Sequence, residues 1–154
     1  MATQIRSFEA RDILPCAQIM AANPLWQRYQ VTLDSATQRL TQGVSQAATI
    51  LVAETAGQVS GFIWYVEKRA FTRSGYIMLI GVDPEVQHLG IGAALMDAAE
   101  QILFRLGKDV ILLVSDFNLG AQHFYERRGF GQVGALPDYV LPGVAELIYR
   151  KTIS

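Results

Sequence analysis

Apolar and polar positions along the chain fall into segments with two different periods. Short apolar runs rich in Ile, Val, Tyr and Trp are separated by polar turns, which is typical of β-strands. These runs predict strands at residues 4–8, 76–82, 110–115, 130–133 and 144–151, and two strands within 48–69 joined by a turn near Ala56-Gly57. The run at 110–115 is apolar throughout, which favours a strand buried on both faces.

Longer segments repeat apolar residues every three or four positions and predict helices over residues 13–22, 35–44, 90–106 and 119–128. Asp12 is expected to cap the first helix, and glycines end the last two. We expect a loop at residues 23–35. This order of elements predicts one α/β (α+β) domain over residues 1–154, with a strand, a loop, a helix and a strand at its centre.

The composition narrows the class of protein. The 154 residues are 51% hydrophobic and carry a net charge of −1, which supplies a core and gives no electrostatic support for coating nucleic acid. Cys16 is the single cysteine, so an internal disulfide is excluded and a reducing compartment is expected. No apolar run nears the roughly 20 residues that span a bilayer. We therefore expect a cytoplasmic protein that binds neither membrane nor metal.

A glycine-containing loop is the first candidate for chemistry. The segment VDPEVQHLGIGAAL runs from Val82 into an apolar helix, and glycines at a helix N-terminus let backbone N–H groups approach an anion such as phosphate. A P-loop is excluded because Ala93-Ala94 stand where Lys-Ser/Thr is required. A dinucleotide-binding loop requires the pattern Gly-x-Gly-x-x-Gly/Ala and an acidic residue at the end of the next strand. Asp116 supplies the acidic residue, but Leu95 stands at the third glycine position. It stays as a weaker alternative.

Two signatures resemble those of a known family. Gln87-His88-Leu89-Gly90-Ile91-Gly92 resembles the Q/R-x-x-G-x-G/A loop of the GNAT superfamily of acetyl-CoA-dependent N-acetyltransferases, and the preceding strand ends in the matching Val82-Asp83-Pro84. The second signature is matched in order and spacing by Asn118, Ala121, Phe124, Tyr125, Gly129 and Phe130. With a closing hairpin expected at 138–151, the resemblance covers nearly the whole chain.

The resemblance implies a fold and a cofactor site. The fold would be a mixed central sheet with helices on both faces and one splayed parallel strand pair, residues 76–82 and 110–115. Acetyl-CoA, the acetyl donor, would bind in the cleft between these strands, with its pyrophosphate on the glycine loop. The implied cofactor-binding residues are Ile80, Gly81, Val82, Gln87, His88, Leu89, Gly90, Ile91, Gly92, Ala93, Asn118 and Tyr125. Asn118 is also expected to cap the following helix.

Catalysis would need an acid and a base. The family's motif implies that Tyr125 protonates the departing CoA thiolate, and the pKa values of a phenol and a thiol, near 10 and 8.5, are close enough for this. The strand at 76–82 has no carboxylate, although many family members carry a glutamate there. The candidates for the base are Glu67, Asp116, Asp138 and Glu146, or a chain of waters. Gly81 predicts a bulge or a close backbone approach.

The acceptor is not identified by the sequence. Trp26, Tyr29, Trp64 and Tyr139 lie in the segments that form the family's acceptor pocket, and they are equally candidates for the core. The expected acceptor is a small-molecule amine, an amino acid or a peptide N-terminus, and a homodimer is left open. A catalytically weak domain that binds acyl-CoA as a sensor is the alternative function.

Overall fold

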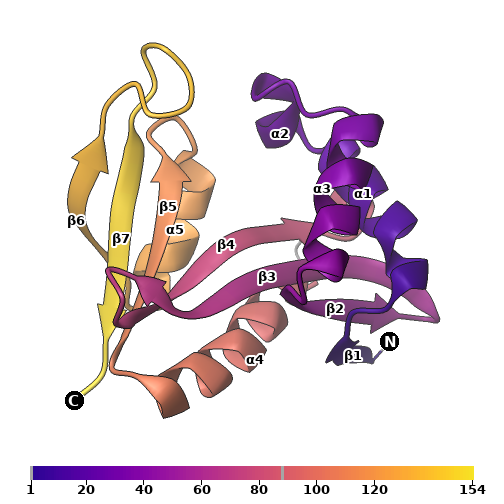
Figure 1. The fold of residues 1–154 in the computed structure, drawn as a ribbon, viewed down its shortest axis with the longest axis horizontal. Helices are drawn as coiled ribbons and strands as arrows, with labels where there is room; N and C mark the ends of the chain where they lie inside the picture. Colours follow the sequence, from indigo (N-terminus) through magenta and orange to yellow (C-terminus); the bar gives the residue numbers. More distant parts are fainter. Residues whose placement is uncertain (1, 88) are drawn as a thin grey trace. The chain divides into compact units, whose positions relative to one another are not determined.

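The structure is a computed structural model that describes residues 2–87 and 89–154 (Figure 1). Within these residues, seven strands are hydrogen-bonded in the order β1-β2-β3-β4-β5-β7-β6. The strands are β1 (Thr3–Ser7), β2 (Thr49–Thr55), β3 (Gln58–Ala70), β4 (Ser74–Val82), β5 (Asp109–Ser115), β6 (Gly131–Leu136) and β7 (Glu146–Thr152). The helices are α1 (Ile13–Ala22), α2 (Pro24–Arg28), α3 (Leu33–Ser45), α4 (Ile91–Leu106) and α5 (Leu119–Arg127), with 3₁₀ turns η1 (Ala10–Asp12) and η2 (Pro84–Val86).

The chain forms two compact units. The first contains Met1–Tyr65 and Leu79–Gln101, and the second contains Val66–Met78 and Ile102–Ser154. Strands β3 and β4 and helix α4 each contribute residues to both units. The expectation of one domain over the whole chain stays a prediction.

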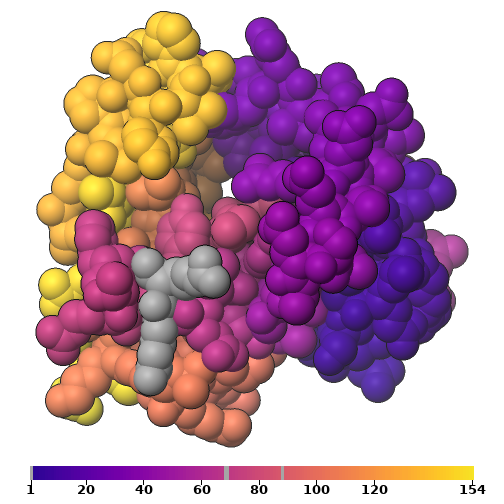
Figure 2. All heavy atoms as spheres, viewed as in Figure 1, coloured from indigo at the N-terminus to yellow at the C-terminus, as the bar shows by residue number. Residues whose placement is uncertain are grey.

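In the first unit, two antiparallel pairings join β1, β2 and β3. Strand β1 pairs with β2 from Thr3↔Thr55 to Ser7↔Leu51, and β2 pairs with β3 as a hairpin. The hairpin turn falls at Ala56 and Gly57 as predicted, with φ of 53° and 78°, the two left-handed residues of a tight turn. The exposed side of α3, in purple, faces the viewer in Figure 2.

Two predictions for the first unit are wrong. The loop expected at residues 23–35 contains α2 and the start of α3. Asn23 begins α2, since its side chain accepts a hydrogen bond from the N–H of Leu25 at 3.0 Å. Asp12 precedes α1 as expected, but its carboxylate does not cap that helix, because Arg6 holds it instead.

In the second unit, strands of both directions meet. Strand β4 runs parallel to β5 over Gly75–Ile77 and Val110–Leu112, whereas β5 pairs antiparallel with β7 along seven residues. Strand β6 adds antiparallel to the other edge of β7 (Figure 1). The prediction of a mixed sheet with a parallel pair is confirmed. The splaying of that pair stays a prediction, because residues 79–82 of β4 belong to the first unit.

Among the residues that the structure describes, no helix is both long and apolar enough to cross a membrane. The same residues include no group of three or more His, Cys, Asp or Glu side chains placed to hold a metal ion.

Candidate active site

The predicted cofactor loop lies in the first unit, between β4 and α4. Asp83 follows β4 and starts the η2 turn by accepting a hydrogen bond from the N–H of Glu85 at 3.0 Å. Its own N–H donates to the carbonyl of Ser60 at 2.8 Å, which fixes the point where the chain leaves the strand. Gln87 and Leu89 are exposed, and His88 lies outside the described residues.

Gly90 turns the chain into α4. Its φ of +77° lies in the left-handed region that side chains with a Cβ rarely adopt, and an added Cβ would meet nothing within 4 Å. The carbonyl of Gly90 accepts the first hydrogen bond of α4, from Ala94 at 3.0 Å. The N–H groups of Ile91, Gly92 and Ala93 therefore belong to the first turn, where a helix presents donors and a positive partial charge.

Gly81 allows a close approach of aromatic rings to β4. An added Cβ would lie 2.8 Å from Trp26 and 2.9 Å from Phe62, closer than carbon atoms pack. These two rings stack on each other with centroids 6.1 Å apart. The close backbone approach predicted for Gly81 is thus confirmed, and the partner is the core of the first unit.

The predicted acceptor residues differ in exposure. Trp26 and Trp64 are each only 8% exposed, and α3 packs against Trp64 at Gly43, where an added Cβ would lie 2.6 Å from the ring. Both tryptophans therefore pack in the core of the first unit. Tyr29 is half-buried, and Tyr139, in the second unit, is 62% exposed. Their contact with an acceptor stays a prediction.

Tyr125, the predicted acid, is buried in the second unit. It lies on α5, is 7% exposed, and packs edge-on against Phe130 with ring centroids 5.8 Å apart. Burial raises the pKa of its phenol above the ordinary value, because the charged form loses hydration. The raised pKa keeps the proton on the phenol but makes the phenol a weaker acid toward a thiolate, so the role of Tyr125 as the acid stays a prediction.

Asn118 begins α5 in the predicted way. Its side-chain oxygen accepts a hydrogen bond from the N–H of Ala121 at 3.2 Å. Gln122, one turn later, donates to the carbonyls of Ser115 and Asp116 and ties α5 to the end of β5. The capping prediction is confirmed, while contact of Asn118 with a cofactor stays a prediction.

The four candidate bases have different surroundings. Glu67 is exposed on β3. Asp116 is exposed and accepts a hydrogen bond from the N–H of Ala145 at 3.0 Å, and the carboxylate of Asp138 accepts one from Gly143 at 2.6 Å. The carboxylate of Asp116 therefore joins the end of β5 to the residue before β7, and that of Asp138 holds the loop at Gly143.

Glu146 is the buried carboxylate of the four, with 8% exposure. It starts β7 opposite Ser115, the last residue of β5, and the hydroxyl of Ser115 donates to it at 3.5 Å. The sequence gives a weak signal for this pairing: an apolar strand that ends in a serine, and an acid at the start of a later strand.

Comparison with known protein families and curated sequences identifies relatives of this chain. A model described as the acetyltransferase (GNAT) family matches residues 13–130. A mycothiol acetyltransferase of Propionibacterium freudenreichii subsp. shermanii is 36% identical over 106 residues, which are 67% of this chain and 34% of that protein. One of Actinosynnema mirum is 31% identical over 142 residues, 89% of this chain and 47% of that protein. The chain thus spans about a third to a half of the length of these relatives.

Solved structures share the fold. Ard1 from Thermoplasma volcanium has a TM-score of 0.81 and 26% identity, with 100% of both chains covered. PaiA N-acetyltransferase from Thermoplasma acidophilum, solved in complex with coenzyme A, has a TM-score of 0.74 and 18% identity, with 99% of this chain and 100% of that chain covered.

Proposed function

Because the chain belongs to the acetyltransferase (GNAT) family, we propose that it transfers an acetyl group from acetyl-CoA to the nitrogen of a primary amine. The observation that carries the proposal is the left-handed Gly90 between β4 and the N-terminus of α4. This geometry suits a pyrophosphate, because a backbone without a Cβ leads directly into the donors of a helix. The family match spans both this loop and Tyr125.

The backbone from Gln87 to Ala93 would bind the pyrophosphate in this proposal. Backbone groups of Ile80 and Val82 would bond the pantetheine arm as an added strand does. The side chain of Asn118, whose oxygen caps α5, still carries its two amide N–H donors. These groups bind and orient the donor, and the chemistry then needs only an acid and a base.

The reaction would proceed by direct attack. The amine nitrogen bonds to the thioester carbon, the carbon–sulfur bond breaks, and the CoA thiolate takes the phenol proton of Tyr125. The proton that the new amide loses passes to a base and returns to Tyr125 through solvent. We assign Glu146 as the first candidate for this base, since its carboxylate is buried and accepts a hydrogen bond from the Ser115 hydroxyl at the end of β5.

The chemical class of the acceptor is inferred from the names of related proteins. Curated relatives named mycothiol acetyltransferases suggest a small-molecule amine. Amino acids and peptide N-termini stay in the panel because the sequence does not identify the acceptor. The chain covers only part of the curated relatives, so the acceptor panel must include mycothiol-type amines, free amino acids and short peptides.

The test is thiol release from acetyl-CoA across this acceptor panel. With an active acceptor, Tyr125→Phe should lower kcat by about 10² to 10⁴ while calorimetry shows retained acetyl-CoA affinity. Tyr149→Phe, which loses only a hydrogen bond to Glu126 of 3.0 Å, is the matched control and should retain activity. Equal rates for Tyr125→Phe and the parent would remove Tyr125 from the chemistry.

Glu146→Gln should lower kcat/KM near neutral pH. The kcat/KM of the variant should approach that of the parent at high pH, where the amine is already deprotonated. Uniform loss at every pH would indicate a structural role for Glu146.

Acetyl-CoA binding without turnover of any acceptor would favour the sensor alternative, and binding of NAD instead of acetyl-CoA would overturn the proposal.

A further inference from the structure

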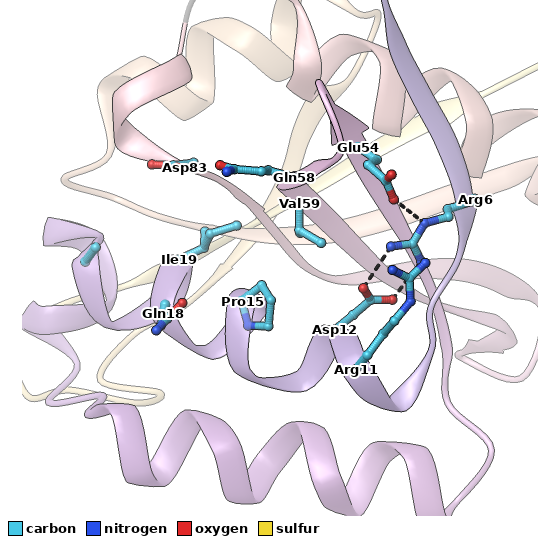
Figure 3. Close-up of a pocket in the computed structure, with 12 residues that line it drawn as sticks. Arg6, Arg11, Asp12, Pro15, Gln18, Ile19, Glu54, Gln58, Val59 and Asp83 are labelled. Atoms are coloured by element: carbon cyan, nitrogen blue, oxygen red, sulfur yellow. Dashed lines mark hydrogen bonds and ion pairs between the residues drawn. The ribbon is translucent and has the colours of Figure 1, made fainter.

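A pocket of about 610 Å³ opens in the first unit (Figure 3). It is lined by Arg6 of β1, residues of η1 and α1, the β2–β3 hairpin, and Asp83 after β4. None of its lining residues is a predicted acetyl-CoA or acceptor residue. The volume lies within the range of about 300 to 1,000 Å³ that small-molecule sites occupy.

One side of the pocket is apolar. Pro15 and Ile19 on α1 and Val59 on β3 contribute side chains to it, and Ile19 is 5% exposed. In Figure 3 these side chains lie between the polar groups at its ends. This surface can bury the hydrocarbon part of a ligand, which is the main source of affinity in a small-molecule site.

The cation at one end of the pocket is already neutralised. Arg6 donates to both carboxylate oxygens of Asp12, at 2.8 and 2.9 Å, and its Nε donates to Glu54 at 2.7 Å. The Asp12 side chain is 2% exposed, whereas that of Glu54 is 24% exposed. One guanidinium therefore faces two carboxylates, and both of them line the pocket.

The lining as a whole has an excess of negative charge. It contains two arginines and three carboxylates, and Arg11 is bound by Glu9. Asp83 uses one carboxylate oxygen for the N–H of Glu85. Figure 3 shows Glu54 beside Arg6 at one end of the pocket and Asp83 toward the other end, with the Gln58 amide next to Asp83 in this view. Such a rim attracts cations that can donate several hydrogen bonds.

We propose that this pocket binds a small organic cation, an ammonium group on a short apolar chain. The ammonium group would lie at the end formed by Asp83 and the Gln58 amide, and the chain would extend over Val59, Ile19 and Pro15. The inference uses residues of the first unit alone and does not depend on the proposed function.

The test is methyl NMR of the full chain, without acetyl-CoA, titrated with n-hexylammonium at pH 7. Resonances of Ile19, Ala22 and Val59 should shift and saturate. Hexanoate and hexanol, which have the same chain length with a negative or no charge, should bind more weakly, by up to about fivefold for hexanol, which is the upper end of the range for loss of a partly exposed ion pair.

Two variants separate the pocket from any other amine site. Asp83→Asn should weaken the binding that these three residues report by about fivefold, Glu54→Gln should weaken it less, and Asp34→Asn, which changes an exposed acid of α3, should leave it unchanged. Asp83 has no bond to Arg6 among the described contacts, so its variant tests the proposal even if Glu54→Gln disturbs the fold.

The proposal is overturned if hexylammonium shifts none of the three residues at tens of millimolar, or if hexanoate binds equally well. It is also overturned if Asp83→Asn and Asp34→Asn bind hexylammonium with the same affinity as the parent.

Discussion

The carboxylate of Asp12 is almost fully buried and accepts three hydrogen bonds, two from Arg6 and one from the backbone N–H of Glu9. Burial alone would raise its pKa, but the bonds from Arg6 and Glu9 outweigh burial, so the pKa lies below its usual range. Because the folded pKa is lowered, the carboxylate stabilises the fold above the ordinary Asp pKa of about 3.9. This stabilisation is lost as the pH falls through the folded pKa.

We therefore expect Asp12→Asn to lower the free energy of unfolding at pH 7 by about 1 to 3 kcal/mol, because Arg6 loses its buried charged partner. The difference from the parent should shrink as the pH falls below about 4, because Asp12 of the unfolded parent takes up a proton at a higher pH than Asp12 of the folded parent. Urea unfolding at pH 7 and pH 3 measures both values, with Asp34→Asn as the exposed control. A difference that is independent of pH would contradict the assigned pKa.

At the scale of elements, Gly81 within β4 and Gly90 directly before α4 have different structural roles. Gly81 admits the rings of Trp26 and Phe62, while Gly90 provides a left-handed turn with open space around it. Gly81→Ala should lower the free energy of unfolding by about 1 to 3 kcal/mol, because the added methyl group overpacks the core. Gly90→Ala should lower it by about 1 to 2 kcal/mol, because alanine is strained in the left-handed region.

A double-mutant cycle with Trp26→Phe distinguishes the two causes. The smaller ring should reduce the cost of Gly81→Ala and leave that of Gly90→Ala unchanged, as measured by urea unfolding. If the cost of Gly81→Ala were the same in both backgrounds, the contact with Trp26 would not explain the glycine.

Local signals explain which elements the sequence predicts. The β2–β3 hairpin, α4 and α5 are continuous periodic segments with a turn or a cap at their ends, and the structure confirms them. Helix α2 has only five residues, too few to show a period, although Asn23 followed by Pro24 is a common helix start. Asp12 was expected to cap α1, but Arg6 binds it from a separate strand, and a local pattern does not contain such a partner.

The same limit applies to the candidate site. The glycine loop and the Asn118 cap are encoded by neighbouring residues and could be predicted. The burial of Trp26 and Trp64 depends on Gly81 and Gly43, which lie in other elements. The sequence does not favour Glu146 over the other three acids, whereas its pairing with Ser115 in the structure distinguishes it.

At the scale of the molecule, Cys16 reports on opening of the core. Its side chain is fully buried, and burial, with the nearby charge of Asp12, raises the pKa of its thiol to about 12. The folded protein should therefore react with a thiol reagent at pH 8 at least about 10³-fold more slowly than free cysteine, because reaction requires an opened state. Labelling followed by mass spectrometry measures this rate, and fast labelling without denaturant would show that α1 opens locally.

The path of the chain through its two units has a consequence for inheritance. The chain passes from one unit to the other after Tyr65, Met78 and Gln101, so each unit is assembled from two separate stretches. A single recombination event between related genes joins one leading stretch to one trailing stretch. Such an event cannot exchange one unit and leave the other intact, because the new junction places residues of different ancestry within at least one of them. Variation in this architecture is therefore expected to accumulate by substitution and loop change more readily than by exchange of parts.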